Sequence, residues 1–491
     1  MFDFLQKKNI KTAILIGFYL ILSLFVLIPQ LGWHVLVDWD EARQGVNAFE
    51  MYKTNNLIYT TFEFQPEHWN TKPPLLIWLQ YICMHIFSSF EVAVRFPTVC
   101  SIILMGIGLI WLFNKIGRIY TGFFAAVICL CCDTLTYFHC FRSGDYDGMM
   151  ISFMMLYLTC FFVYAKTNKQ KYLILFFVFL ILDTMTKGIQ SLIPLPALAA
   201  YLLITKRFVI ELKNKNVYIF SAIFLLIVLG YYFIRERFDN GYIQSVLDNE
   251  VFGRYSSAIE GHNGTKTYYW NLIKNDNFIF GIILFPLAVL LNYLLKNKDC
   301  KQITSFFLLN ILFYFAVITL GQTKLPWYYF PILPMIAVMI ATGIDNILTS
   351  SLINKRKTVF AITFLAICCC FIYPYSNVVN NSFHAKTYRS DIQYFCGHYI
   401  MRDIAQNKLP YDNIYYLSDN DDNNQVSVFY WHLLKENNKN FYKINLDDIA
   451  TDMLIQVNKE DNFKKIQDRF NIEELYSLNQ ARIIKIKDKK Q

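Results

Sequence analysis

The sequence predicts an all-α protein that crosses a membrane many times and ends in a small soluble α/β domain. Of its 491 residues, 55% are hydrophobic and only 17% are charged, and the mean hydropathy is +0.31. Soluble globular proteins carry about 25% charged residues, so lipid must solvate most of this chain. The hydrophobic residues come in blocks such as 12–29, 121–137 and 278–295, each roughly long enough for a helix to cross a hydrocarbon core of about 30 Å. A membrane β-barrel is excluded because the blocks lack the alternation of barrel strands.

Lysine and arginine residues mark the cytoplasmic loops. The net charge is +9, but the 46 Lys and Arg form no continuous face that would favour nucleic acid, and they gather in short clusters between the hydrophobic blocks. The positive-inside rule places such clusters on the cytoplasmic side, so two crossings separate consecutive clusters. The clusters lie at residues 7–11, 115–118, 166–171, 206–215, 296–301 and 355–357.

One apolar stretch near the N-terminus is predicted to lie on the membrane surface. Three such stretches fall between the first two basic clusters, and three crossings would invert every later loop. The middle stretch, 73–90, is short, begins with a Pro-Pro pair, and holds Gln80 and His85 among aromatic residues, which is typical of an amphipathic interfacial helix. We therefore expect about eleven spans, a cytoplasmic N-terminus and interfacial helices in the first outer loop.

The chain is expected to divide into a membrane domain, 1–377, and an extracytoplasmic α/β domain, 378–491. The tail is polar, and short stretches that suit strands alternate in it with helical patterns. The predicted strands cover 413–417, 441–444 and 453–457, and a predicted helix covers 461–470.

With this topology, the unusually polar segments all fall on the outer side of the membrane. They are residues 38–72, 142–147, 187–188, 235–275 and 322–329. Five polar segments that meet at one membrane face predict a functional site there.

Two pairs of carboxylates are the first candidates for chemistry. Asp40 and Glu41 follow the first span, where an ionised carboxylate can act as a base or bind a metal. Asp145 and Asp147 lie at the mouth between two spans, and acidic groups near lipid tend to be functional or paired. Two structural alternatives stay open, which are Asp40 as a helix cap and a pairing of the second acidic pair with Arg142.

Three lysines lie on the outer side, against the positive-inside pattern. They are Lys72 before a Pro-Pro pair, Lys187 before a glycine, and Lys324 before a Leu-Pro-Trp-Tyr-Tyr run. Lysine binds phosphate as a point charge, so these residues suit a phosphate attached to a membrane lipid. Snorkelling from a helix end is the structural alternative.

Two further residues complete the candidate set. His262 lies in the fourth outer segment, where a ligand, a base and a plain loop residue are all open interpretations, and Tyr328 lies in the fifth. The cysteines match no zinc motif, so the sequence leaves the metal question open.

Six short motifs occur in order within about residues 10–345. They are Asp40-Glu41-Ala42-Arg43, Lys72-Pro73-Pro74-Leu75-Leu76, Arg95-Phe96-Pro97, Gly144-Asp145-Tyr146-Asp147, Thr186-Lys187-Gly188 and Thr323-Lys324-Leu325-Pro326-Trp327-Tyr328. Together they resemble the membrane-integral glycosyltransferases of the GT-C type that use a polyprenyl-phosphate sugar. The nearest branches are the bacterial relatives of protein O-mannosyltransferases and the aminoarabinose transferase of lipid A.

The resemblance implies functions for several residues. In that family an acidic residue of the first loop, here Asp40, is linked to catalysis, a second one matching Asp147 lies nearby, and the lysine before Pro-Pro, here Lys72, contacts the carrier phosphate. The lipid A branch usually has a glutamate before this lysine that is linked to a metal site, whereas this chain has Thr71. No cofactor is certain on this basis, and a divalent metal stays open.

We therefore expect a GT-C type glycosyltransferase of the bacterial cytoplasmic membrane, surrounded by membrane lipids and active on the periplasmic side. A polyprenyl-phosphate sugar is already activated, so the enzyme needs a base for an acceptor hydroxyl and cations for the departing phosphate. Asp40 is the expected base, and Glu41 and Asp147 are expected to position either this base or the sugar. The residues expected to bind substrate are Lys72, Asp145, Lys187, His262, Lys324 and Tyr328.

Direct displacement of the carrier phosphate would invert the anomeric centre. The expected acceptor is a hydroxyl or phosphate group of lipid A, another envelope glycan or a protein. A transporter or lipid flippase is the alternative from another class, with a path along Asp133, Asp145, Asp147 and Asp183. Transporters usually have paired halves with broken helices, and the sequence shows no internal repeat, so the glycosyltransferase interpretation is favoured.

Overall fold

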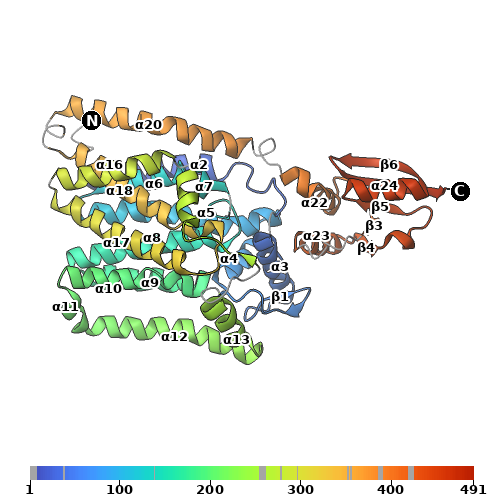
Figure 1. Ribbon diagram of the computed structural model, residues 1–491, viewed down its shortest axis with the longest axis horizontal. Helices are drawn as coiled ribbons and strands as arrows, with labels where there is room; N and C mark the ends of the chain where they lie inside the picture. The colour runs from blue at the N-terminus through green and yellow to red at the C-terminus, as the bar shows by residue number, and fades with distance from the viewer. Residues whose placement is uncertain are drawn as a thin grey trace.

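The computed structural model describes residues 8–36, 39–137, 139–253, 261–276, 279–295, 297–350, 353, 356–384, 391–417 and 425–490. In these residues a helical bundle forms a large domain, and a five-stranded sheet with helices forms a small C-terminal domain at one end of the bundle (Figure 1). The predicted fold class, a polytopic helical membrane protein with a small α/β domain, is confirmed.

Eleven helices in the described part of the chain form the bundle. They are α2 (Lys8–Leu27), α5 (Phe90–Lys115), α6 (Ile119–Leu130), α8 (Tyr146–Thr167), α9 (Gln170–Lys187), α10 (Leu195–Ile204), α12 (Lys215–Phe238), α16 (Ile279–Leu294), α17 (Lys298–Leu320), α18 (Ile332–Leu348) and α20 (Lys357–Phe383). All except α6, α10 and α16 are long and apolar enough to cross a membrane. The eleven helices equal the number of predicted spans, and in the described part of the chain eight of them have the length for a crossing.

Helix α8 forms the centre of the bundle. Its apolar window is buried along its whole length, whereas those of α12 and α20 are largely exposed. No charged residue lies between Asp147 and Lys166, and a helix that is apolar on all sides is buried. Asp145 caps the N-terminus of α8 by accepting a hydrogen bond from the backbone of Tyr146. The N-terminus of α8, with Asp145 and Asp147, therefore lies at the centre of one end of the bundle.

Helix α4 (Leu75–Met84) is too short to cross the membrane. Ten residues of α-helix rise about 15 Å, which is half of a hydrocarbon core of about 30 Å. The helix starts after Pro74 and packs against α3 (Trp39–Thr54) and α5 at the end of the bundle that carries the C-terminal domain (Figure 1). This arrangement agrees with the predicted surface helix.

The connections between the bundle helices carry short elements. Near α3 and the N-terminus of α8 lie β1 (Thr61–Phe62), β2 (Gln65–Pro66), α7 (Asp133–Tyr137), the 3₁₀ turn η1 (Gly188–Leu192), α13 (Tyr242–Val246), the π-helical turn η2 (Leu247–Gly253), α15 (Tyr268–Asn275) and the 3₁₀ turn η4 (Pro326–Tyr329). At the opposite end of the bundle α11 (Phe208–Leu212) joins α10 to α12 (Figure 1).

The C-terminal domain contains a mixed sheet with the strand order β4-β3-β5-β7-β6. Strand β3 is parallel to β4 and β5, and β7 is antiparallel to β5 and β6. Its elements are α22 (Asp391–Ala405), β3 (Asn413–Leu417), α23 (Gln425–Glu436), β4 (Asn440–Ile444), η5 (Leu446–Asp448), β5 (Leu454–Val457), α24 (Glu460–Arg469), β6 (Phe470–Leu478) and β7 (Ala481–Lys489).

The predicted strands and helix of the tail correspond to β3, β4, β5 and α24 within one residue at each end. The hairpin of β6 and β7 was not predicted. Helix α20 runs past the predicted domain boundary at 378 and ends at Phe383. The side chains of Ile455, Ile466 and Ile484 pack between the sheet and α24, where they are fully buried.

Candidate active site

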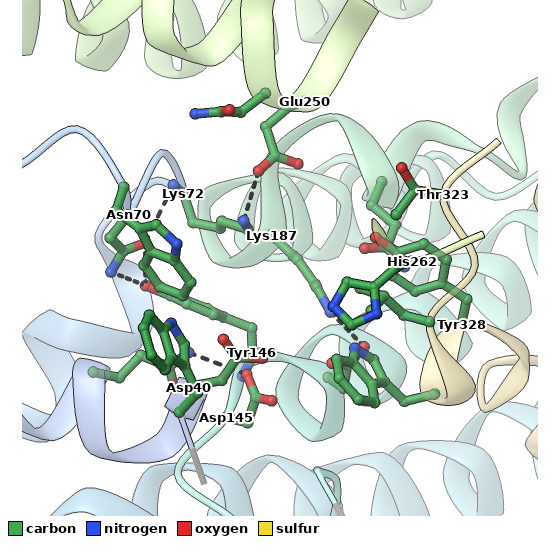
Figure 2. Close-up of a pocket in the computed structure, with 18 residues that line it drawn as sticks. Asp40, Asn70, Lys72, Asp145, Tyr146, Lys187, Glu250, His262, Thr323 and Tyr328 are labelled. Atoms are coloured by element: carbon green, nitrogen blue, oxygen red, sulfur yellow. Dashed lines mark hydrogen bonds and ion pairs between the residues drawn. The ribbon is translucent and has the colours of Figure 1, made fainter. Parts of the chain in front are cut away.

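A cavity of about 610 Å³ lies at the end of the bundle where the C-terminal domain sits. Figure 2 shows labelled side chains from separate elements that line this space. The lining residues are Trp39, Asp40, Gln44, Trp69, Asn70, Lys72, Asp145, Tyr146, Asp147, Lys187, Gln190, Asn249, Glu250, His262, Thr323, Leu325, Trp327 and Tyr328. All five predicted polar segments contribute to this wall, although residues 254–260 of the fourth segment lie outside the described residues.

Asp40, His139 and Asp145 form an acidic group in the cavity wall. His139 donates a hydrogen bond to Asp145, and its Nδ1 lies 4.0 Å from an Asp40 carboxylate oxygen. Gln44 Nε2 donates to the other Asp145 oxygen at 3.1 Å. Burial by itself raises the pKa of Asp145, but the hydrogen bond and charge of His139, with the charge of Lys187, outweigh it and lower this pKa to about 2. Asp145 is therefore an ionised carboxylate at neutral pH.

The same three residues are the ones that could hold a metal ion. One ligand atom from each of Asp40, His139 and Asp145 lies within 4.8 Å of the other two. Carboxylate oxygens together with an imidazole nitrogen suit divalent ions such as Zn²⁺ or Mn²⁺. Thr71, at the position of the family's metal-linked glutamate, instead donates its hydroxyl to Glu250 at 2.8 Å.

Lys187 and Asp147 form a buried ion pair in the cavity wall. The distance from Lys187 Nζ to Asp147 Oδ1 is 2.5 Å, and the two side chains are 7% and 1% exposed. Lys187 ends α9, and Gly188 follows it with a φ of +62°, a left-handed conformation that glycine adopts without a steric penalty. The pair joins the end of α9 to the first turn of α8.

Lys72 contacts a carboxylate from a distant part of the chain. Its Nζ donates to Glu250 Oε1 at 2.6 Å, and the two side chains are 15% and 12% exposed. Glu250 belongs to η2, so this ion pair connects the first and fourth polar segments across the cavity (Figure 2).

Aromatic rings cover much of the remaining wall. Trp327 stacks on His139 with 3.9 Å between the ring centroids, and Trp39 lies 6.2 Å from Trp69. Indole rings combine an apolar face with an N–H donor at the edge. They suit a ligand that, like a sugar, has both apolar C–H faces and polar groups.

Seven of the nine predicted site residues line this cavity, and two do not. The seven are Asp40, Lys72, Asp145, Asp147, Lys187, His262 and Tyr328. The Glu41 carboxylate accepts two hydrogen bonds from Arg95 at 2.7 and 2.8 Å. Lys324 Nζ donates to three backbone carbonyls around the end of α17, at 2.6–2.9 Å. Glu41 and Lys324 therefore stabilise the backbone around the cavity instead of facing it.

Among the residues that the sequence reasoning did not select as site residues, four make contacts that shape the chemistry of the cavity. They are Gln44, His139, Glu250 and Trp327. His139 has a φ of +52°, which is uncommon for a residue other than glycine and often marks a functional site. In the sequence its only signal is its place shortly before the Gly-Asp-Tyr-Asp motif, and Trp327 already belongs to the last motif.

An apolar groove of about 290 Å³ adjoins the cavity. Four residues line both spaces, namely Gln190, Glu250, Thr323 and Tyr328. Most of the remaining wall is aliphatic, with Ile189, Leu192, Ile193, Pro196, Val317 and Ile318. A ligand that fills both spaces has a charged or polar head and an apolar chain.

Known proteins share both sequence and fold with this chain. The model of the family described as dolichyl-phosphate-mannose-protein mannosyltransferase matches residues 71–232. Undecaprenyl phosphate-alpha-4-amino-4-deoxy-L-arabinose arabinosyl transferase 2 of Proteus mirabilis is 27% identical over 354 residues, which are 69% of this chain and 60% of that protein. The chain thus spans about 60% of the length of this relative.

The structural similarity extends over nearly the whole chain. The crystal structure of ArnT from Cupriavidus metallidurans bound to undecaprenyl phosphate has a TM-score of 0.68 at 13% identity and covers 96% of this chain and 97% of that one. The apo structure of the same protein has a TM-score of 0.66 at 12% identity, with the same coverage. Together with the family match, these findings confirm the resemblance drawn from the motifs, and the chain has the fold of the GT-C type membrane glycosyltransferases.

Proposed function

We propose that the protein is a glycosyltransferase of the bacterial cytoplasmic membrane that moves a sugar from a polyprenyl phosphate to an acceptor on the outer side. The observation that carries this proposal is the polar cavity with lysines and carboxylates that shares its wall with an apolar groove. A polyprenyl-phosphate sugar has the matching chemistry, a polar head on a long apolar chain. The likeness to an undecaprenyl-phosphate-aminoarabinose transferase supports this class of donor.

In the proposed reaction the acceptor oxygen forms a bond to the anomeric carbon while the bond from that carbon to the carrier phosphate breaks. Asp40, whose side chain is 26% exposed at the cavity, takes the proton of an acceptor hydroxyl as a general base. The electron pair of the broken bond leaves with the polyprenyl phosphate. One displacement on the face opposite the phosphate inverts the anomeric centre, and an ionised acceptor phosphate needs no base.

The departing phosphate requires positive charge, and Lys72 is the residue proposed to supply it. Lys72 lines the cavity beside Glu250, which also lines the apolar groove. A phosphate at Lys72 would thus lie where an apolar chain can enter the groove. Lys187 adds positive charge in the same wall and neutralises Asp147 at 2.5 Å.

Asp40, His139 and Asp145 are proposed to orient the acceptor molecule. Asp145 stays ionised and holds the imidazole of His139 next to Asp40. The imidazole of His139 thus lies beside both carboxylates, whose ligand atoms are within 4.8 Å of each other. A divalent cation held by these three residues would polarise an acceptor oxygen when bound.

The decisive experiment is turnover by the purified protein in nanodiscs with polyprenyl phosphates that carry different sugars. Candidate acceptors are lipid A, envelope glycans and envelope proteins, and mass spectrometry measures both the free polyprenyl phosphate and the modified acceptor. Mass spectrometry of envelope lipids and glycoproteins from a deletion strain reduces the number of candidate acceptors. Sugar transfer that requires Asp40 supports the proposal. Movement of a lipid across liposomes without any sugar transfer would instead support the transporter alternative.

A further inference from the structure

The C-terminal domain contacts the helix that carries Asp40. Helix α23 of this domain packs along α3, and the two approach closely at Gly45, where an added Cβ would lie 3.3 Å from Phe429 and 2.4 Å from Leu36. At the far end of this contact, His432 Nε2 lies 2.8 Å from Glu50 Oε1, and both side chains are buried. The contact therefore runs along α3 from Gly45 to Glu50.

The backbone just before α3 is bound by side chains of the same domain. Tyr399 of α22 shares a hydrogen bond of 2.7 Å with His34, and Arg402 donates to the carbonyl of Trp33. The hydroxyl of Tyr430, in α23, accepts a hydrogen bond from the Leu36 backbone N–H at 3.1 Å. The C-terminal domain thus binds residues 33–36 directly.

Tyr430 also connects this segment to the membrane domain. Its hydroxyl donates to Glu91 Oε1 at 3.1 Å, and the ring is completely buried. Glu91 lies one helical turn before Arg95, which binds the Glu41 carboxylate and donates to the carbonyls of Leu31, His34 and Val35 at 2.8–3.0 Å. Arg95 binds the carbonyls of this segment, and Tyr430 binds the N–H of Leu36.

We infer that Tyr430 is a positioning residue through which the C-terminal domain fixes the entry of α3 and thereby the place of Asp40 in the cavity. This inference rests on the proposed function. A phenylalanine at position 430 keeps the ring but has neither the donor nor the acceptor, so the Leu36 N–H and the Glu91 carboxylate lose a buried partner. Because a displacement of about 1 Å at a reacting group can cost about 100-fold in rate, the loss would appear in turnover.

The test compares Tyr430→Phe with His432→Gln in the full-length protein. Both variants alter a contact of α23 with the rest of the chain. Tyr430 binds Leu36 and Glu91, whereas His432 binds Glu50, ten residues after Asp40 and about 15 Å further along α3. Three quantities are measured, namely kcat and KM for the sugar donor, the thermal midpoint, and hydrogen–deuterium exchange of the peptide that covers residues 31–42.

We expect Tyr430→Phe to lower kcat at least about tenfold without changing KM for the donor and to raise exchange in the 31–42 peptide. His432→Gln should lower the thermal midpoint while it leaves both kcat and this exchange as in the wild type. Glu91→Leu, which removes the acceptor of the Tyr430 hydroxyl and leaves the C-terminal domain intact, should act in the same direction as Tyr430→Phe and replaces it if that variant does not fold.

Equal kcat losses in both variants, or wild-type kcat and exchange in Tyr430→Phe, would overturn the inference. A wild-type protein that transfers no sugar from any polyprenyl phosphate would refute the proposed function instead. The exchange measurement needs no substrate, so it still decides whether Tyr430 holds the segment before α3.

Discussion

Lys72 and Glu250 form an ion pair of 2.6 Å at the cavity although 178 residues separate them in the sequence. The lysine is the one that the proposed function assigns to the carrier phosphate. Glu250 thus occupies, with its own negative charge, the place where an anionic head group would bind. On the proposed function, a donor phosphate would compete with this carboxylate for Lys72.

The first prediction concerns this competition. Glu250→Gln should increase the affinity for undecaprenyl phosphate at least about fivefold, since even a solvent-exposed ion pair contributes up to about 1 kcal/mol and this pair is largely buried. Binding is measured by thermophoresis of the protein in nanodiscs. Asp248→Asn is the matched control because it removes a neighbouring charge whose side chain is exposed and pairs with Gln244. Weaker binding in the Glu250→Gln variant would mean that Glu250 helps to hold the donor instead of competing with it.

The second prediction concerns the base. Asp40→Asn should lower kcat by about 10²- to 10⁴-fold, which is the usual contribution of a general base. The thermal midpoint should stay as in the wild type, because this side chain is partly exposed at the cavity. Asp461→Asn on the exposed side of α24 is the control with unchanged turnover. Wild-type turnover in the Asp40→Asn variant would remove Asp40 from the mechanism.

The third prediction uses the buried pair of Lys187 and Asp147. Lys187→Met alone should destabilise the fold by about 3–5 kcal/mol, because it leaves an unpaired carboxylate in a buried position. The double variant Lys187→Met with Asp147→Asn should recover most of this stability but not the turnover. Unfolding in detergent and the transfer assay measure the two effects. A double variant with restored turnover would show that the pair is only structural.

The fourth prediction concerns pH and the C-terminal domain. Burial lowers the pKa of His398 to about 4, below its ordinary value of about 6.5. Between these values the unfolded chain binds more protons than the folded one, so stability is lost as the pH falls from about 6.5 to 4. His398 should contribute about 3 kcal/mol to this loss.

This contribution is measured as the difference between the wild type and His398→Gln. Thermal unfolding of both proteins is followed at pH 7, 5.5 and 4, and the glutamine can keep the hydrogen bond that His398 shares with Ser427 at 3.0 Å. The wild type should lose more stability than the variant over this range. Parallel pH curves for the two proteins would contradict the prediction.

The bundle could be predicted from the sequence because its signals are local. Hydropathy and basic loops define each helix without reference to its neighbours, and they yield the eleven helices of the structure as well as the short proline-led α4. The hairpin of β6 and β7 was missed although 470–478 and 481–489 carry partial alternation around Asn479 and Gln480. Asn479 has a φ of +53°, as tight hairpin turns require.

The candidate site was predicted in part. Glu41 and Lys324 were predicted as site residues but do not line the cavity. Asp40 and Glu41 are adjacent in the sequence, but consecutive residues of a helix point about 100° apart, so only one of them faces the cavity. The other binds Arg95. Lys324 has no charge partner in the sequence nearby, and only the folded chain shows that it binds the carbonyls at the end of α17.

The sequence alone determined the membrane class of this protein, the polar segments that meet at one end of the bundle, and Asp40, Lys72 and Asp147 as residues of one cavity. Their spacing and hydropathy are properties of short stretches, which a linear chain already displays. Only the tertiary structure decided that His139 lies beside both Asp40 and Asp145, that Glu250 pairs with Lys72, and that Tyr430 binds Leu36 shortly before α3. These contacts join residues from separate helices and domains, and packing brings them together through interactions that no local pattern encodes.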